Sequence, residues 1–376
     1  MSNSLHIALL GAGQLGGSFA LALRSADPSI RITAYDTHGA SAQLLVEIGG
    51  ATDTAATAAD AVNHADMVIL AAPVRAFRAL AESIAPALAD GTIVTDVGSV
   101  KTSMLPLYKL LPKARIVPGH PIAGSEKAGV AVAKAGLFKG KLVILTPDES
   151  ADSNAVQAVE GLWQLAGADV IAMPVEVHDH IYAYVSHLPH LIAFVAAAFL
   201  HGQGVRIGSD EDTLQRFLRI SRSNPRMWTD IFLENREALL PALAAYIAVL
   251  QHFASELRHG EPTKGDTVAI AKAHLPRILA ASLISSVSLY EQQSGMELRP
   301  FGAGGMRDIA APAADNPEEA MQAISNHATP MAEAIEAILP HFVAIETLIG
   351  AEDEPALFAH IQGLVRDAEA LIAPRQ

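Results

Sequence analysis

The stretch Leu5-His-Ile-Ala-Leu-Leu-Gly-Ala-Gly-Gln-Leu-Gly16 decides the fold of the N-terminal part of this chain. An apolar run, Leu5 to Leu10, leads directly into the pattern Gly-x-Gly-x-x-Gly, and an apolar helical pattern, Ser18 to Leu23, follows it. Asp36 stands 20 residues past Gly16, at the end of a second apolar run. The glycine pattern alone would be weak evidence for a nucleotide site. A strand before it, a helix after it and an acid at this spacing together predict a dinucleotide-binding Rossmann fold.

The predicted cofactor residues are Gly11, Gly13, Gln14, Leu15, Gly16 and Asp36. We expect Gly11 to permit the tight turn, Gly13 to let the backbone approach a pyrophosphate, and Gly16 to let the helix pack closely on the strand. The carboxylate of Asp36 would accept the ribose hydroxyls and repel a 2′-phosphate, and no arginine follows it directly. NAD is therefore expected as cofactor in preference to NADP. The alternative is a glycine turn with no ligand.

Short apolar runs alternate with amphipathic stretches from Leu5 to about Pro147, which predicts βαβ units around a parallel sheet. The expected strands are Leu5–Leu10, Arg31–Tyr35, Asp66–Ala71, Gly91–Asp96, Arg115–Pro118 and Lys141–Thr146. One more short run, Asp169–Ala172, precedes a long region rich in Ala, Leu and Ile at helical spacing. We expect an α/β Rossmann domain over residues 1–174, followed by an all-α domain.

The helical region contains a possible repeat. Val185-Ser-His-Leu-Pro-His-Leu-Ile-Ala-Phe194 aligns with Lys272-Ala-His-Leu-Pro-Arg-Ile-Leu-Ala-Ala281 at an offset of 87, and Asn224-Pro225 aligns with Asn316-Pro317 at an offset of 92. An insertion of five in Glu291–Phe301, which we expect to be a loop, accounts for the difference. Duplication predicts helical units over 175–262 and 263–376, whereas the alternative is chance similarity between two Ala-rich helices.

Composition excludes several classes of protein. The 376 residues are 51% hydrophobic and 18% charged, which argues against disorder. A formal net charge of −14 disfavours nucleic acid and anionic membranes as partners. The absence of cysteine removes thiol nucleophiles and fits a reducing, cytoplasmic compartment. The longest apolar stretches, Leu191–Leu200 and Ala238–Leu250, are shorter than the roughly 20 residues of a membrane helix. We expect no membrane span.

Two turns after later strands carry unusual polar density: Asp96-Val-Gly-Ser-Val-Lys101 and Gly119-His-Pro-Ile-Ala-Gly-Ser-Glu-Lys127. Ligands of open parallel sheets bind outside the carboxyl ends of the strands, so both turns should face the cofactor. A neutral imidazole at His120 could take the hydroxyl proton as a hydride leaves the adjacent carbon, and Ser99 could orient that hydroxyl. In the alternative interpretation, His120 caps a turn and Ser99 starts a helix.

These motifs, with Ser186-His-Leu-Pro-His190 and Asn224-Pro-Arg-Met-Trp-Thr-Asp-Ile-Phe-Leu-Glu-Asn-Arg236, resemble the prephenate and arogenate dehydrogenase family of tyrosine biosynthesis over roughly residues 5 to 260. The resemblance implies an NAD(P)-binding domain, a helical domain that also mediates dimerisation, and oxidative decarboxylation of prephenate, a small cyclohexadienol, to 4-hydroxyphenylpyruvate. It implies that His120 is the catalytic histidine and Ser99 its partner. Further substrate-site positions implied by the resemblance are Ser125, Glu126, His187 and His190.

The spacing of His187 and His190 leaves three roles open. The two residues lie on one face of a helix, but no acidic partner follows at ligand spacing, so we expect no metal site. They could be hydrogen-bonded core histidines. We favour a role facing the substrate.

The chain departs from the family pattern in the stretch before each Asn-Pro. The first unit keeps Arg219, in the slot where the family binds a substrate carboxylate, but has Arg216 where the family has Asp. The second unit reads Gly304-Gly-Met-Arg-Asp308 and keeps the glycines and the Asp, but has Ala311 in the arginine slot. Because the losses are complementary, we expect the units to pair as a pseudo-dimer within one chain, with an ordinary homodimer as the alternative.

The single site of such a pseudo-dimer would combine His120, Ser99 and Arg219 with Asp308 or Arg307. Three rival functions remain at this stage. They are an arogenate dehydrogenase, a dehydrogenase of small hydroxy acids that relies on a lysine of its helical domain, and a retired enzyme that binds NAD as a sensor or scaffold.

Overall fold

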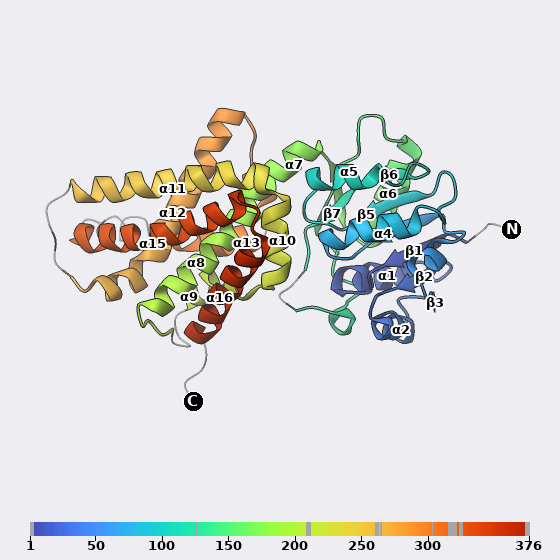
Figure 1. The fold of residues 1–376 in the computed structure, drawn as a ribbon, viewed down its shortest axis with the longest axis horizontal. Coiled ribbons are helices and arrows are strands. Elements are labelled where there is room, and N and C mark those ends of the chain that lie inside the picture. Colours follow the sequence, from blue (N-terminus) through green and yellow to red (C-terminus); the bar gives the residue numbers. More distant parts are fainter. Residues whose placement is uncertain are drawn as a thin grey trace. The chain divides into compact units, whose positions relative to one another are not determined.

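The computed structural model of the protein describes residues 4–124, 127–207, 212–259, 263, 265–302, 304–314, 322 and 326–372. The chain forms two compact units, Met1–Asp179 and His180–Gln376 (Figure 1). The first is an α/β unit and the second is helical, as the sequence predicts. The boundary falls inside helix α7 (Val175–Tyr182), a few residues after the expected one.

The main sheet of the first unit is parallel throughout and has the strand order β3-β2-β1-β4-β5-β6. Its strands are β1 (His6–Leu10), β2 (Arg31–Tyr35), β3 (Asp53–Thr54), β4 (Met67–Leu70), β5 (Ile93–Asp96) and β6 (Arg115–Val117). This order is that of a Rossmann sheet and confirms the predicted fold class. The sequence did not indicate β3, because two residues are too few to form an apolar run.

A second sheet corrects the prediction for the later strands. It contains β7 (Gly119–Pro121), β8 (Leu142–Leu145) and β9 (Asp169–Ala172), with β7 antiparallel to β8 and β9 parallel to it. We expected Lys141–Thr146 in the parallel sheet and His120 in a turn, but His120 pairs with Ile144 within this sheet. Pro118 has no N–H to continue the β6 ladder, and its carbonyl instead accepts a hydrogen bond from Thr146 N at 3.0 Å.

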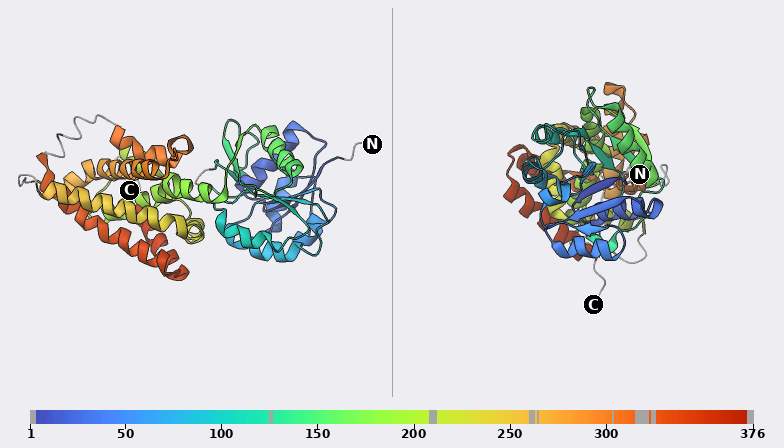
Figure 2. Two further views of the ribbon diagram at one scale, coloured as in Figure 1. Left: turned by 90° about the horizontal axis from the view of Figure 1, so that it is seen from above. Right: turned by 90° about the vertical axis from the view of Figure 1, so that its right-hand side faces the viewer.

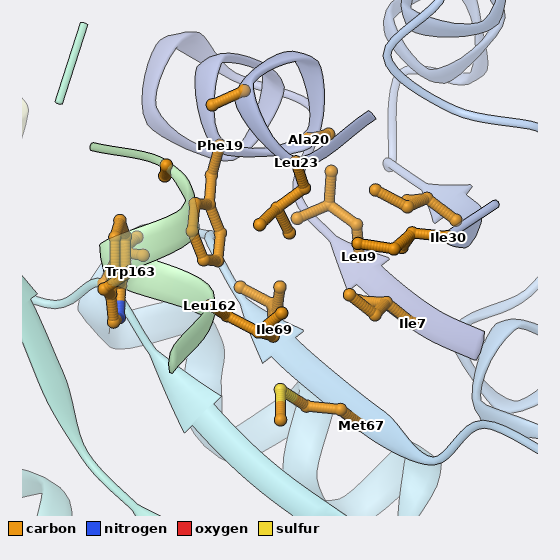
Figure 3. Close-up of a cluster of buried hydrophobic side chains, with 14 of the residues drawn as sticks. Ile7, Leu9, Phe19, Ala20, Leu23, Ile30, Met67, Ile69, Leu162 and Trp163 are labelled. Atoms are coloured by element: carbon orange, nitrogen blue, oxygen red, sulfur yellow. The ribbon is translucent and has the colours of Figure 1, made fainter. Parts of the chain in front are cut away.

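Helices cover both faces of the main sheet. One face is covered by α1 (Gln14–Ala26), α2 (Gly39–Glu47) and α6 (Ser153–Leu165), and the other by α3 (Ala58–Val62), α4 (Phe77–Ile84) and α5 (Leu105–Tyr108). Successive side chains of a strand alternate between these two cores. On the first face the rings of Phe19 and Trp163 stack with centroids 3.8 Å apart, joining α1 to α6 (Figure 3).

The second unit is built from helices, as predicted. They are α8 (Leu188–Gly202), α9 (Asp212–Phe217), α10 (Pro225–Glu234), α11 (Arg236–Arg258), α12 (Thr267–Ser294), α13 (Gly304–Ala314), α15 (Ala328–Gly350) and α16 (Glu354–Ile372). A π-helical turn, Ala183–His187, leads into α8. The long helices α11, α12 and α15 pack along one another (Figure 2).

One expected loop is shorter than the sequence suggested. Residues 291–294 of the predicted loop Glu291–Phe301 continue α12, which ends where Gly295 adopts a left-handed φ of 71°. Glutamate and glutamine have good helix propensity, so their polarity alone does not mark a loop.

Three helical stretches correct the estimate of apolar length made from sequence. Val175–Gly202, Arg236–His259 and Thr267–Ser294 are long and apolar enough to cross a membrane by length and composition. We underestimated them because occasional polar residues interrupt the apolar runs. In the first stretch, 89% of the most apolar window is buried inside the protein. A core helix that is covered on all sides is apolar all round for the same reason as a membrane helix.

Candidate active site

Two glycines of the N-terminal motif are required by the protein itself. Gly11 has a φ of 112°, and a Cβ there would lie 2.4 Å from the carbonyl oxygen of Ala71. A Cβ on Gly16 would lie 2.2 Å from the carbonyl oxygen of Gly11. Around Gly13, by contrast, no atom of the described part of the chain lies within 4 Å of the Cβ position. Gly13 precedes α1, so the open space suits a pyrophosphate at that helix N-terminus.

Asp36 joins the end of β2 to the glycine motif. Its Oδ2 accepts a hydrogen bond from Ala12 N and its Oδ1 accepts one from His38 N, both at 2.8 Å. Each carboxylate oxygen keeps further acceptor capacity, as ribose hydroxyls would need. The side chain of Gln14 lies near Gly124, since its Oε1 is 3.7 Å from the Cβ position there. The first turn of α1 therefore faces the loop that follows His120.

A buried charged cluster connects the two polar motifs. Lys101, whose side chain is fully buried, donates from Nζ to Oδ1 of Asp96 and to the carbonyl oxygen of Gly119, both at 2.5 Å. The hydroxyl of Tyr108 donates to the other Asp96 oxygen at 2.5 Å. Burial lowers the pKa of Lys101 against the opposing effect of Asp96, and burial raises the pKa of Tyr108. The cluster holds the end of β5 against the start of β7.

His120 lies on β7 and is 9% exposed. Its Nδ1 is 2.8 Å from Nε2 of His178, whose own Nδ1 is 2.8 Å from Oδ1 of Asp179. Asp179 also accepts hydrogen bonds from the backbone N–H of Lys101 at 3.0 Å and of Thr102 at 2.7 Å. Burial would raise the pKa of Asp179, but the hydrogen bond and charge of His178, with the hydrogen bonds from Thr102, outweigh it and lower the pKa.

The donors and acceptors in the series Asp179, His178 and His120 define which ring nitrogen of His120 carries hydrogen. The carboxylate of Asp179 only accepts, so Nδ1 of His178 carries its hydrogen. Burial lowers the pKa of His178, so its ring is neutral and its Nε2 is an acceptor. His120 must then donate from Nδ1, and in its neutral form it carries a lone pair on Nε2. This tautomer is inferred from the hydrogen-bond network.

Ser99 lies half-buried in the turn after β5, three residues beyond Asp96. The turn is held by a hydrogen bond from Gly98 N to Asp96 Oδ1 at 2.6 Å, and β5 contacts β7, the strand of His120. Ser99 and His120 thus lie on neighbouring segments of the first unit. The predicted substrate residues Ser125 and Glu126 lie outside the described residues.

The second unit contains a separate cationic and aromatic cluster. Arg219 donates from Nη2 and Nε to Oδ2 of Asp308, at 2.6 and 2.8 Å. The ring of His190 stacks on Trp228 with centroids 3.6 Å apart. Gly305 lets the backbone of α13 lie close to the ring of His190, because a Cβ at this position would be 3.4 Å from Cε1 of His190. The predicted residues Arg219, His190 and Asp308 therefore lie in one part of this unit.

The two predicted histidines of this unit differ in environment. His190 donates from Nδ1 to the carbonyl oxygen of Ser186 at 2.8 Å. Burial, with a smaller effect of Arg219, lowers its pKa to about 3, so Nε2 keeps a lone pair. His187 is only 1% exposed, and its Nδ1 is 2.9 Å from the side-chain amide of Asn235. His187 thus occupies the core environment that we had considered as its alternative.

Sequence reasoning missed His178, Asp179, Trp228 and Asn235. His178 stands 58 residues beyond His120, and Asp179 follows it, in a short polar run at the start of the helical region that has the pattern of a solvated first turn. Only folding brings them to β7. Trp228 was quoted as part of a motif, but its stacking on His190 depends on the packing of α10 against α8.

Comparisons with known proteins agree with this arrangement. Residues 19–172 match the family described as prephenate dehydrogenase, nucleotide-binding domain. Residues 174–267 and 261–363 match prephenate dehydrogenase, dimerization domain.

Among curated proteins, a cyclohexadienyl dehydrogenase of Zymomonas mobilis is 37% identical and the match covers 65% of this chain and 86% of the relative. A prephenate dehydrogenase of Bacillus subtilis is 34% identical, over 64% of this chain and 67% of the relative. A solved prephenate dehydrogenase from A. aeolicus, in complex with hydroxyphenyl propionate and NAD+, has a TM-score of 0.61 and 35% identity, over 67% of this chain and 91% of that one. This chain belongs to the prephenate dehydrogenase family.

Proposed function

We propose that the protein converts prephenate to 4-hydroxyphenylpyruvate by oxidative decarboxylation, with NAD as hydride acceptor, in the cytoplasmic synthesis of tyrosine. The observation that carries this proposal is the hydrogen-bonded series from His120 through His178 to Asp179. Nδ1 of His120 is engaged by His178, which places the basic lone pair of the neutral ring on Nε2, the atom to which we assign the substrate hydroxyl. Membership of the family supports the same reaction.

The reaction begins with the hydroxyl on C4 of the ring. His120 accepts the hydroxyl proton at Nε2 while the C4 hydride leaves, and Ser99 orients the hydroxyl. When bound, NAD accepts that hydride. The resulting ketone loses carbon dioxide from C1, and the ring becomes aromatic. The phenolate oxygen then takes the proton back from His120, because a phenol holds its proton more tightly than imidazolium does. Aromatisation makes the sequence effectively irreversible.

The fit of NAD rests on the glycine motif and Asp36. Gly13 leaves the N-terminus of α1 open to a pyrophosphate, and Oδ2 of Asp36 accepts a hydrogen bond from the glycine turn at Ala12 N. A carboxylate there repels a 2′-phosphate, which favours NAD over NADP.

We assign the recognition of substrate carboxylate to Arg219. Prephenate carries two carboxylates, and an arginine can bind one through two parallel hydrogen bonds. Asp308 accepts from Nε and Nη2 and leaves Nη1 of Arg219 to donate. The neutral Nε2 of His190 offers an acceptor nearby. Arogenate differs from prephenate only in the side chain beyond the ring, so it is the nearest rival substrate.

A direct assay tests the proposal. Purified protein is mixed with NAD and either prephenate or arogenate, and NADH formation is followed by its absorbance, with NADP in parallel. We expect the fastest rate with prephenate and NAD. A faster rate with arogenate would change the proposed substrate to arogenate but would leave the proposed reaction, oxidative decarboxylation, unchanged. A protein that binds NAD but oxidises neither compound would support the sensor alternative and end the proposal.

A further inference from the structure

We infer that the C-terminal helical segment, residues 263–376, is an internal copy of the preceding one that takes the place of a partner subunit and completes a single substrate-binding cluster per chain. The inference rests on the proposed function only for the ligand of Arg219.

Equivalent residues of the two segments make equivalent contacts. The dimerization domain of the family matches the chain twice, over 174–267 and 261–363. Helices α11 and α15 have 23 residues each and begin 92 residues apart, the offset that separates the two Asn-Pro pairs. The pairing of His187 with Asn235 recurs at the same offsets as His274 with His327, whose rings have centroids 6.1 Å apart.

The packing of the two copies has the pattern of a two-fold dimer. Helix α11 packs on α15, α9 packs on α13, and α8 contacts α12, so each of these three helices of the first copy contacts its own counterpart (Figure 1). Contact between identical patches defines an isologous interface, which normally forms between two subunits. Within this unit the same kind of interface forms inside one chain.

The two copies have diverged in a complementary way. Asp308, which belongs to the second copy, binds Arg219 of the first, and Gly305 of the second copy adjoins His190 of the first. At the counterpart position the first copy has Arg216 instead of Asp308, and the second has Ala311 instead of Arg219. A carboxylate-binding arginine is therefore retained in only one of the two equivalent places.

The ion pair has a definite role in this arrangement. Arg219 is a long side chain and 45% exposed, so a fixed partner is needed to hold its guanidinium in one orientation. Asp308 is a positioning residue that supplies this restraint from the second copy. An ordinary dimer would need a second chain to do so.

Molar mass provides the first test and needs no substrate. Light scattering of the full chain at micromolar concentration should give the mass of one chain. The mass of two chains would overturn the replacement of a partner subunit. Because this measurement is independent of turnover, it separates failure of the inference from failure of the proposed reaction.

Hybrid complementation provides the second test. Arg219→Ala should raise KM for prephenate about 10- to 100-fold and Asp308→Asn about 3- to 30-fold, each with a smaller change in kcat. Glu336→Gln is the matched control, because it breaks the ion pair with Arg258 that also joins the two copies. We expect its KM to stay at the wild-type value.

Co-expression of Arg219→Ala chains with Asp308→Asn chains then distinguishes the two arrangements. If both residues of a site come from one chain, every site remains defective and the high KM persists. If sites form across chains, one of the two sites in each mixed dimer is intact, which is about a quarter of all sites after random pairing, and a component with wild-type KM appears. That recovery, or an unchanged KM in Asp308→Asn alone, would contradict the inference.

Discussion

His120 takes its chemical character from two residues that lie far from it in sequence. The neutral ring of His178 and the carboxylate of Asp179 determine which of its nitrogens carries hydrogen. In this respect the arrangement resembles that around catalytic histidines in general, whose tautomer is set by the group behind them.

His120→Asn should lower kcat about 10²- to 10⁴-fold with little change in KM, because it removes a proton acceptor that acts in the transition state. Steady-state kinetics with prephenate and NAD measure both constants. Normal turnover in this variant would refute the assignment of the base.

Asp179→Asn should lower kcat about 10- to 100-fold and also move the pH dependence of kcat/KM. His120 must be neutral to act, so activity falls on the acid side as His120 is protonated. Loss of the Asp179 charge removes a stabilising influence on that protonated form, so the acid limb should move to lower pH. Asp179→Glu should restore part of the shift. If the acid limb of the kcat/KM profile stays at the same pH, Asp179 serves only to support the fold.

His190 should make stability depend on pH. Its folded-state pKa of about 3 lies below the ordinary value of 6.5, so the unfolded chain binds the proton more readily. This contribution to stability is complete above about pH 6.5 and declines as the pH falls toward 3, by at most about 1.4 kcal/mol per pH unit. His190→Asn should flatten urea-unfolding stability between pH 7 and 4, whereas the exposed His252→Asn should leave the slope unchanged.

At the scale of elements, α10 shows what the first Asn-Pro pair does in the chain. Asn224 caps the helix by accepting a hydrogen bond from Met227 N at 3.1 Å, and Pro225 occupies the first helical position, where no N–H is needed. The pair therefore sets the start of the helix that carries Trp228.

Asn224→Ala should destabilise the protein by about 1 kcal/mol, because one N–H of the first turn of α10 loses its partner. Asn224→Ser should keep most of the stability. Urea unfolding followed by Trp228 fluorescence measures the difference. Equal stability of the alanine and wild-type proteins would show that water replaces the cap without cost.

The π-turn before α8 also has a local cause. Pro189 has no N–H for the regular helical bond to Val185, and the N–H of Leu188 instead bonds to the carbonyl of Ala183, five residues back. His187 at the end of this turn and His190 just after it both contact Trp228.

At the scale of the molecule, each unit contains one of the two tryptophans. Trp163 stacks on Phe19 of α1, the helix whose N-terminus we assign to the pyrophosphate. In a Trp228→Phe background, NAD at 100 times its Kd should therefore stabilise the unfolding transition reported by Trp163 by about 2.7 kcal/mol. NADP at the same concentration should stabilise it less. Equal stabilisation by NAD and NADP would mean that Asp36 does not determine cofactor selectivity.

Local pattern was enough for the regular parts of the molecule. The glycine motif, the buried strands and the helical spacing after Val175 each reflect short-range requirements of backbone geometry and burial, which a sequence displays directly. The expected combination of Arg219 with Asp308 also came from sequence, through the complementary losses in the two Asn-Pro stretches. The predictions for β7 and for the end of α12 were wrong. Pro118 ends the β6 ladder before β7, and α12 continues through polar residues until Gly295.

Sequence by itself determined the Rossmann unit and the helical unit, because these depend on residues close together along the chain. Tertiary structure alone decided that His178 and Asp179 lie behind His120, and that Asp308, of the two candidates Asp308 and Arg307, pairs with Arg219 across 89 residues. Pairing over such distances depends on the packing of whole elements, whose free energy is spread over many side chains and leaves no local pattern to read.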